Sequence, residues 1–456
     1  MRILAATASL FVSLSALSAP AYADILIENV NGLTLDAKGE VETFSAVLVG
    51  DDGRVEQVYS RKEKRPGKVD YQLDGKGRVM MPGLIDSHVE LMELGLALLK
   101  SKAGFEAAPT GEPRPEDRDV ALADVQRLLL SRGITTVADM GTTIEDWQTY
   151  RRAGDLGMLS IRIVAYAEGT RDMALIGGPR PTPWLYNDRL KLNGVVLTLD
   201  GVAEIHEAWL KAPYADTPGN SGKARITEAQ LRNQMSRGAI DNFQIALRAH
   251  GDAASSAALD AIEELARTYS GDRRWRIEGL DQLDAVDLAR FGAHGAVASM
   301  RPRRLGDLST KAAALLGPER LASIHRWRSL TDGGITLAFG SSSRSEAPAP
   351  FAAMATAITR QERDALSFGG WQPQERLTRE EALAAFTAGG AHAVFAEGRL
   401  GRIAKGQRAD FILVDRDPLL SSPHELRDMQ VLQTWVGGKL VYDAQKVEPE
   451  KPLTGR

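Results

Sequence analysis

One stretch of the chain organises the rest, and it reads Met81-Pro82-Gly83-Leu84-Ile85-Asp86-Ser87-His88-Val89-Glu90. The Pro-Gly pair precedes a short apolar run at Leu84 and Ile85, a pattern that predicts a buried strand ending in polar side chains. His88 and Glu90 are two residues apart, so on an extended backbone their side chains point the same way. A histidine and a carboxylate on one face indicate a metal site or its remnant. The alternative is a pair of ordinary hydrogen-bonded structural residues.

Strands and helices alternate after this stretch. Counting the strand that begins at Leu84, we predict eight strands, the others at 134–138, 161–166, 195–199, 243–247, 275–278, 296–299 and 335–339. Thr227 and Gln230 form a capping box that predicts the start of one intervening helix. This alternation predicts an α/β fold, a TIM-like (β/α)8 barrel, whose functional site lies at the C-terminal ends of the strands.

The two chain ends carry short β runs, at 25–27, 46–49 and 55–58 and again at 411–414, 431–436 and 439–442. We expect them to share a small composite β-sandwich. The predicted domains are a signal peptide at 1–23, the N-terminal part of the sandwich at 24–82, the barrel at 83–395, the C-terminal part of the sandwich at 396–446 and a tail at 447–456.

The first 23 residues have the layout of a secretory signal. Arg2 precedes an apolar run at 3–17, and Ala21-Tyr22-Ala23 forms a small-residue cleavage site before Asp24. The alternative is a membrane anchor, but the run is shorter than the ~20 residues that a spanning helix needs. We therefore expect export, to the periplasm, with no membrane span in the mature chain.

Composition limits the classes of partner. Of 456 residues, 56 are basic and 60 acidic, which gives a net charge of −4, and 43% are hydrophobic. Such a chain offers no basic field for nucleic acid, and a small-molecule ligand suits it better. There is no cysteine, so any metal would need nitrogen and oxygen ligands. A protein partner and the oligomeric state have no signature in the sequence.

Residues 82–89 resemble the first-strand signature of the amidohydrolase superfamily. Residues 213–220, 358–361, 370–371 and 377–383 are similar to the amidohydrolase-3 group, which includes N-substituted formamide deformylases, and 401–410 resembles the point where that family begins the C-terminal half of its small β domain. The resemblance implies a hydrolase of carbon–nitrogen bonds other than peptide bonds. It also implies metal ions that activate a water molecule, since a bound divalent ion lowers the pKa of water to roughly 7.

The sequence departs from the family pattern at nearly every metal ligand that the resemblance implies. Of those ligands, His88 alone matches. The resemblance predicts histidine at three further positions, lysine at a fourth and aspartate at a fifth, and the chain has Glu90, Arg248, Gly279, Val196 and Ser342 there respectively.

Four further polar residues are candidates for the same cavity, namely Asp200, His250, Asp252 and Glu278. A shift in register would let His250 replace the histidine missing at Arg248. No cofactor is expected from this set, and a single divalent metal such as zinc on His88, Glu90, His250 and Glu278 is the alternative.

Two hypotheses follow. In the first, the metal centre has been dismantled and the protein is a degenerate homologue that binds a ligand or a protein. In the second, it remains a hydrolase that uses a rebuilt mononuclear site or metal-free acid–base catalysis. The family arrangement places Glu90 and Arg248 at the ends of the first and fifth strands, so we predict that they form an ion pair across the barrel mouth.

Overall fold

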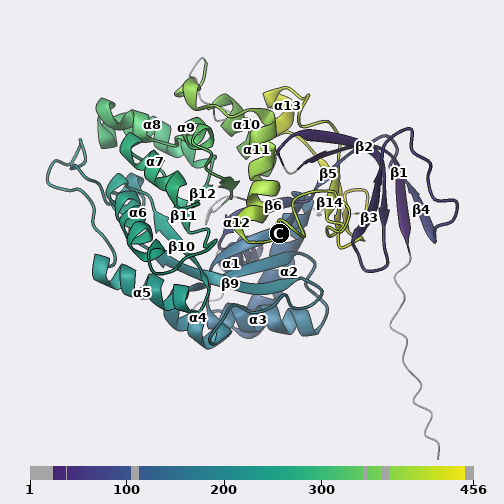
Figure 1. The fold of residues 1–456 in the computed structure, drawn as a ribbon, viewed down its shortest axis with the longest axis horizontal. Helices are drawn as coiled ribbons and strands as arrows, with labels where there is room; N and C mark the ends of the chain where they lie inside the picture. The colour runs from purple at the N-terminus through teal and green to yellow at the C-terminus, as the bar shows by residue number, and fades with distance from the viewer. Residues whose placement is uncertain (1–23, 37, 104–111, 342–346, 362–368, 447–456) are drawn as a thin grey trace, which may run out of the picture.

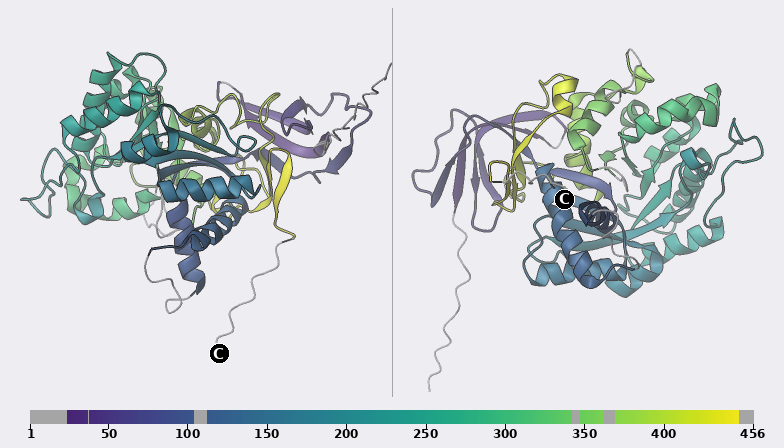
Figure 2. Two further views of the ribbon diagram at one scale, coloured as in Figure 1. Left: turned by 90° about the horizontal axis from the view of Figure 1, so that it is seen from below. Right: turned by 180° about the vertical axis from the view of Figure 1, so that it is seen from behind.

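The computed structural model describes residues 24–36, 38–103, 112–341, 347–361 and 369–446. Its strands form two sheets, one built by both chain ends and one by the middle of the sequence. The sheet of the chain ends lies to one side of the other in every view (Figure 1, Figure 2). The predicted signal peptide, the predicted tail and Ser342 fall outside the described residues.

The middle of the chain builds a nearly closed barrel of parallel strands that pair in sequence order. All eight predicted strands are present, and the (β/α)8 fold is confirmed. In the pairing of neighbouring strands, Arg248 of β10 lies opposite Thr198 of β9 on one side and opposite Glu278 of β11 on the other. The strands are β6 (Leu84–Val89), β7 (Ile134–Thr142), β8 (Arg162–Glu168), β9 (Leu190–Thr198), β10 (Gln244–Ala249), β11 (Arg276–Gly279), β12 (Val297–Met300) and β13 (Leu337–Phe339).

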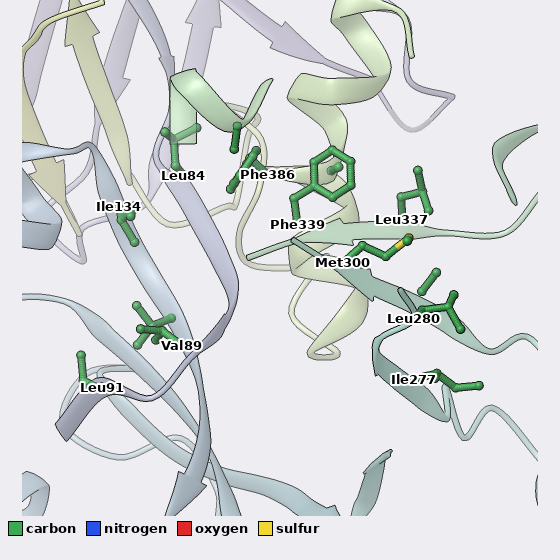
Figure 3. Packing of buried hydrophobic residues seen from close by; sticks show 14 of the residues in the cluster. Leu84, Val89, Leu91, Ile134, Ile277, Leu280, Met300, Leu337, Phe339 and Phe386 are labelled. Carbon is green, nitrogen blue, oxygen red and sulfur yellow. The ribbon is translucent and has the colours of Figure 1, made fainter. Parts of the chain in front are cut away.

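The barrel closes where its last strand meets its first. Gly340 follows β13, and a Cβ atom there would lie 2.6 Å from the amide nitrogen of His88, so the close approach requires glycine. The Ile85 amide donates to the Phe386 carbonyl at 2.7 Å, which supplies a partner for β6 at the seam. Phe339 and Phe386 pack edge to face beside it, with ring centroids 5.7 Å apart (Figure 3).

The chain ends form one mixed sheet in the order β16-β15-β14-β5-β1-β2-β3, with β4 also paired to β1. Ile27 and Phe44 from the N-terminal half share an apolar cluster with Phe411 and Trp435 from the C-terminal half, as the shared-sheet prediction requires. Its strands are β1 (Ile25–Leu35), β2 (Val41–Val49), β3 (Val55–Tyr59), β4 (Tyr71–Asp74), β5 (Val79–Pro82), β14 (Phe411–Val414), β15 (Val431–Val436) and β16 (Lys439–Asp443).

The stretch at 81–90 crosses from one sheet to the other. Met81 and Pro82 end β5 in the sheet of the chain ends, and Leu84 begins β6 in the barrel. Gly83 lies between them, where a Cβ atom would come within 2.4 Å of the Thr135 hydroxyl oxygen. The glycine therefore allows the chain to pass tightly against β7 as it enters the barrel.

Helices surround the barrel (Figure 1). The capping box predicted at Thr227 and Gln230 is present at the start of α5. Among the helices that the structure describes, none combines the length and apolarity needed to cross a bilayer. They are α1 (Leu91–Ala103), α2 (Pro115–Ser131), α3 (Ile144–Asp155), α4 (Gly169–Gly177), α5 (Glu228–Ile240), α6 (Asp252–Ala266), α7 (Ala285–Ala293), α8 (Arg304–Leu316), α9 (Trp327–Asp332), α10 (Pro350–Thr359), α11 (Arg379–Ala385), α12 (Ala388–Ala393) and α13 (Pro423–Arg427).

Candidate functional site

A cavity of about 490 Å³, here called the barrel-mouth cavity, opens at the C-terminal ends of the barrel strands. Barrels of this type carry their sites at this end. Five of the residues singled out from the sequence line it, namely His88, Glu90, Asp200, Arg248 and His250. They come from the ends of β6, β9 and β10 or from the segments just beyond them, so barrel closure brings together residues that are far apart in the chain.

Glu90 and Arg248 form an ion pair in this cavity. Arg248 Nη2 lies 2.9 Å from Glu90 Oε1, and both side chains are 16% exposed. The same nitrogen donates to the Met140 carbonyl, whereas the buried Arg248 Nε has no hydrogen-bond partner among the described residues. The pair predicted from the sequence is therefore present, and it links the first and fifth strands of the barrel.

His88 is held by a buried carboxylate below the cavity. Its Nδ1 lies 2.6 Å from Glu278 Oε2, and Arg276 Nε donates to Glu278 Oε1 at 2.7 Å. Burial alone would raise the pKa of Glu278, but the Arg276 charge and the His88 hydrogen bond outweigh burial and lower that pKa to about 2. Burial lowers the pKa of His88 to about 4 despite the neighbouring carboxylate. At neutral pH the uncharged ring therefore donates from Nδ1, and Nε2 keeps its lone pair.

His250 is held by a second carboxylate. Its Nδ1 lies 2.9 Å from Asp281 Oδ2, and its backbone amide donates to Asp200 Oδ1 at 2.9 Å. Gly279 lies against the ring, with φ at +95°, and a Cβ atom there would come within 2.7 Å of His250 Cε1. Glycine at this position thus follows from where His250 lies, because a larger residue would displace the imidazole.

Four other predicted cavity residues lie elsewhere, which corrects the expectation that they line the cavity. Val196 is 1% exposed and packs in an apolar cluster inside the barrel. Glu278 and Gly279 are buried in the layer beneath the cavity. Asp252 begins α6, where its Oδ1 accepts from the Lys211 amide at 2.9 Å. The sequence located strand ends but did not separate the cavity wall from the layer below, because that depends on barrel geometry.

Most of the arginines in the cavity wall were not predicted from the sequence. Arg225, Arg301, Arg303 and Arg304 line the cavity together with Arg248. Arg301 Nη2 lies 3.3 Å from His250 Nδ1, and burial, reinforced by the charge of Arg304, lowers the pKa of Arg301 to about 10. Arg301 directly follows the end of β12, so its place after a predicted strand was an available signal. Arg225 lies in a loop with no such signal.

The residues present do not fit the metal centre that the family resemblance implies. A guanidinium has no lone pair to offer a metal. At ~4 Å and an effective dielectric near 20, it also repels each unit of metal charge by about 4 kcal/mol. Arg248 supplies such a group beside Glu90, and the Nδ1 of His88 is occupied by Glu278. Across the part of the chain that the structure describes, no three histidine or carboxylate side chains converge as metal ligands would.

A model of the amidohydrolase family matches residues 92–442, and the chain belongs to this family. The predicted membership of its amidohydrolase-3 group is confirmed. Protein LONG AFTER FAR-RED 3 of Arabidopsis thaliana is 32% identical over 346 residues, which cover 72% of this chain and 58% of the plant protein. N-substituted formamide deformylase of Arthrobacter pascens is 25% identical over 332 residues, with 69% and 58% covered. The chain thus spans 58% of the length of either relative.

Solved structures share the fold at lower identity. An uncharacterized metal-dependent hydrolase from Pyrococcus horikoshii OT3 superposes with a TM-score of 0.76 at 20% identity, over 88% of this chain and 99% of the other. A corresponding protein from Pyrococcus furiosus gives 0.73 at 22% identity, over 87% and 100%. At these identities the likeness shows the barrel and its accompanying sheet.

The Glu90–Arg248 pair predicts energetic coupling between the two residues. Arg248→Ala and Glu90→Gln are each expected to cost about 1–3 kcal/mol of unfolding free energy, because each removes the charge-assisted contact between two partly buried groups. The double variant is expected to lose less than the sum of the two, by about 0.5–3 kcal/mol. Urea denaturation of the four proteins measures this coupling. Losses that add to within ~0.5 kcal/mol would show that the contact contributes nothing.

Proposed function

We propose that this protein is an amidohydrolase-family member that has lost metal-dependent hydrolysis and binds a small ligand in the barrel-mouth cavity. The ion pair of Arg248 with Glu90, at 2.9 Å, carries the proposal, because a fixed cation stands where the family pattern requires metal ligands. The cavity of about 490 Å³ has the size of a small-molecule site. Its arginines favour a ligand that bears a carboxylate, since the guanidinium fork matches a carboxylate bidentately.

The first test of this proposal is metal content. The purified protein is dialysed against trace zinc, manganese and iron, and its metal content is then measured by elemental mass spectrometry. We expect well under one equivalent of each metal. The physical reason is the donor set, in which Glu90 is paired with Arg248 and His88 with Glu278. Near-stoichiometric metal that disappears in His88→Ala would overturn the proposal.

A second candidate function is metal-free hydrolysis, and one contact favours it. The Glu278 carboxylate fixes His88 through Nδ1 at 2.6 Å, so a neutral imidazole with a free lone pair faces the cavity. Such a ring can act as a general base on water. This function would be established if the metal-free protein hydrolyses simple N-substituted amides. The activity should be lost in His88→Ala and strongly reduced in Glu278→Gln. Absence of turnover with stoichiometric binding of a carboxylate would favour the ligand-binding role.

We also propose that the protein is exported, on the strength of the apolar run at 3–17 and the cleavage site before Asp24. Intact-mass measurement of protein isolated from its native cells is expected to find a chain that begins near Asp24. A dominant species that still contains residues 1–23 would contradict export by this route.

A further inference from the structure

A second cavity, here called the basal groove, lies between the barrel and the sheet of the chain ends, and its volume is about 750 Å³. The segment between α3 and β8 and the segment before β9 form its barrel side. The β2–β3 turn, the segment before β14 and the β15–β16 turn form the other side. The groove lies away from the barrel-mouth cavity, since it shares no lining residue with it.

The charged lining of the basal groove is strongly biased. Its basic residues are Arg54, Arg162, Arg189, Arg408 and Lys439, and its acidic residue among those described is Asp52. In the barrel-mouth cavity, by contrast, the lining arginines are accompanied by Glu90, Asp200, Glu207 and Asp307. The basal groove is therefore the more positively charged of the two, and its field favours an anion.

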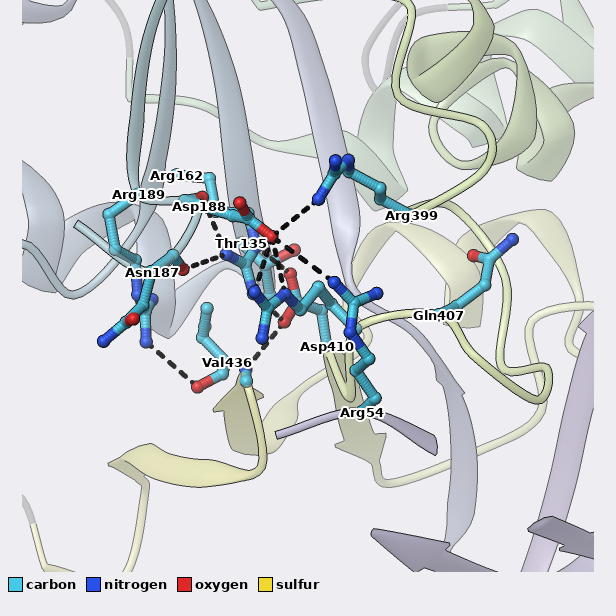
Figure 4. Close-up of polar contacts among 12 residues, drawn as sticks. Arg54, Thr135, Arg162, Asn187, Asp188, Arg189, Arg399, Gln407, Asp410 and Val436 are labelled. Atoms are coloured by element: carbon cyan, nitrogen blue, oxygen red, sulfur yellow. Dashed lines mark hydrogen bonds and ion pairs between the residues drawn. The ribbon is translucent and has the colours of Figure 1, made fainter. Parts of the chain in front are cut away.

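Two carboxylates behind the wall neutralise only part of this charge. Asp188 Oδ2 is shared by several guanidiniums, at 2.6 Å from Arg408, 3.0 Å from Arg399 and 3.9 Å from Arg54 (Figure 4). Arg54 is also paired with Asp52, whose Oδ2 lies 3.2 Å from Arg54 Nε, so two carboxylates face these three positive charges. Asp410 does not relieve this excess, because its two oxygens bind Arg162 at 2.6 and 2.8 Å.

The backbone that carries Asp188 is held in a rare conformation. Tyr186, Asn187 and Asp188 have φ angles of 53°, 55° and 62°, so three consecutive non-glycine residues are left-handed. Such residues cost about 1–3 kcal/mol each and persist where surrounding contacts fix them. Here Arg162 Nη1 fixes the turn by donating to the carbonyls of Asn187 and Asp188 at 3.2 and 2.7 Å.

The opposite wall is equally fixed. A Cβ atom on Gly53 would lie 2.5 Å from the Gly437 carbonyl oxygen, so the β2–β3 and β15–β16 turns approach as closely as glycine allows. Arg54 follows Gly53, its side chain is 30% exposed, and its Nη1 donates to the Gly406 carbonyl at 2.8 Å. The groove is thus preformed, with a partly exposed guanidinium on a rigid turn.

We propose that the basal groove binds a small phosphate-bearing anion and that Arg54, whose side chain is 30% exposed, contacts it. The positive charge of the lining favours the several negative oxygens of a phosphate group, and the charge of that group would offset the excess around Asp188. Recognition rests on the phosphate, because the Tyr186 ring that lines the groove is already covered. Arg151 lies over it at 5.7 Å, and the space beside Gly154 is filled by the same ring.

The test uses the full-length mature protein and inorganic pyrophosphate. Calorimetric titration at constant ionic strength is expected to show saturable binding at one site, together with a rise in melting temperature that potassium chloride at equal ionic strength does not give. Arg54→Gln is expected to weaken pyrophosphate about tenfold, the effect of one lost charge-assisted hydrogen bond. Lys439→Gln provides a second variant on the same wall.

Two controls locate the site. Arg232→Gln removes an arginine that is likewise paired with carboxylates, Glu228 and Glu264, but lies on α5 outside either cavity, so affinity should stay within about twofold. Citrate carries carboxylates and no phosphate, so it tests the preference for phosphate, and we expect it to bind more weakly than pyrophosphate. Failure of pyrophosphate to bind, or binding that survives Arg54→Gln and Lys439→Gln but is lost in Arg225→Gln at the barrel mouth, would overturn the proposal.

Discussion

Glu278→Gln is expected to lower the free energy of unfolding by about 3–5 kcal/mol, among the largest effects of any single substitution in this chain. Glu278 and Arg276 are both fully buried side chains, and their contact at 2.7 Å compensates both charges. Glutamine keeps the shape but removes the negative charge, so the Arg276 guanidinium stays buried without a counter-ion. Urea denaturation at neutral pH measures this loss, provided that the slope of the unfolding free energy against urea concentration is unchanged.

A matched control is Glu264→Gln, which removes the carboxylate from the ion pair of Glu264 with Arg232. The Glu264 side chain is 55% exposed. Its expected cost is below about 1 kcal/mol, because solvent already screens that pair. The double variant Arg276→Met with Glu278→Leu removes both buried charges and is expected to recover much of the lost stability. A loss below about 1 kcal/mol in Glu278→Gln would show that solvent reaches this pair.

Asp410→Asn is expected to cost a similar amount, about 3–5 kcal/mol, for a different structural reason. Asp410 precedes β14, and both of its oxygens bind Arg162 at the start of β8, so this bidentate pair joins the sheet of the chain ends to the barrel. Its Oδ1 also accepts from the Gly437 amide at 2.7 Å. Burial alone would raise the pKa of Asp410, but Arg162 outweighs burial and lowers it, so the charged form is the one bound.

Denaturation combined with limited proteolysis tests the Asp410 prediction. The variant is expected to be cut first in the β15–β16 region, because the hairpin loses one of its links to the barrel, the contact of Gly437 with Asp410. Asp260→Asn serves as the control, since Asp260 pairs with Arg290 on the surface with its side chain 54% exposed. If Asp410→Asn and Asp260→Asn lose equal stability, the buried pair does not join the two sheets.

The fold was predictable because its signal is local and repeated. Each barrel strand is a short apolar run bounded by glycine or polar residues, as in Ile134 to Ala138. When such runs alternate with amphipathic helices, they form a parallel sheet that the helices cover. The Pro-Gly pair at 82–83 was predicted to precede the first barrel strand at Leu84, and the structure divides the stretch at 81–90 at Gly83 between two sheets. That division depends on Thr135 packing against the glycine, a contact between segments about fifty residues apart.

The barrel and the sharing of a sheet by the chain ends were both predictable from the sequence, and comparison with the family pattern located the departures at Glu90, Val196, Arg248 and Gly279. The resemblance also predicted that Glu90 and Arg248 would meet, because in the family arrangement the first and fifth strands both supply ligands to the metal centre, and the structure places the two side chains 2.9 Å apart. Residue patterns were sufficient for the barrel and the shared sheet, whereas the conclusions about the site also needed the family resemblance.

Which polar groups line the cavity and which are buried beneath it depends on the closed barrel. Arg276 and Glu278 alternate with Ile277 on one short strand, yet it is the closed barrel that buries both charges and directs Glu278 to His88. The clustering of Arg54, Arg162 and Arg408 around Asp188 and Asp410 likewise joins segments hundreds of residues apart. Burial and charge balance depend on every neighbour in space, and a linear pattern records only neighbours along the chain.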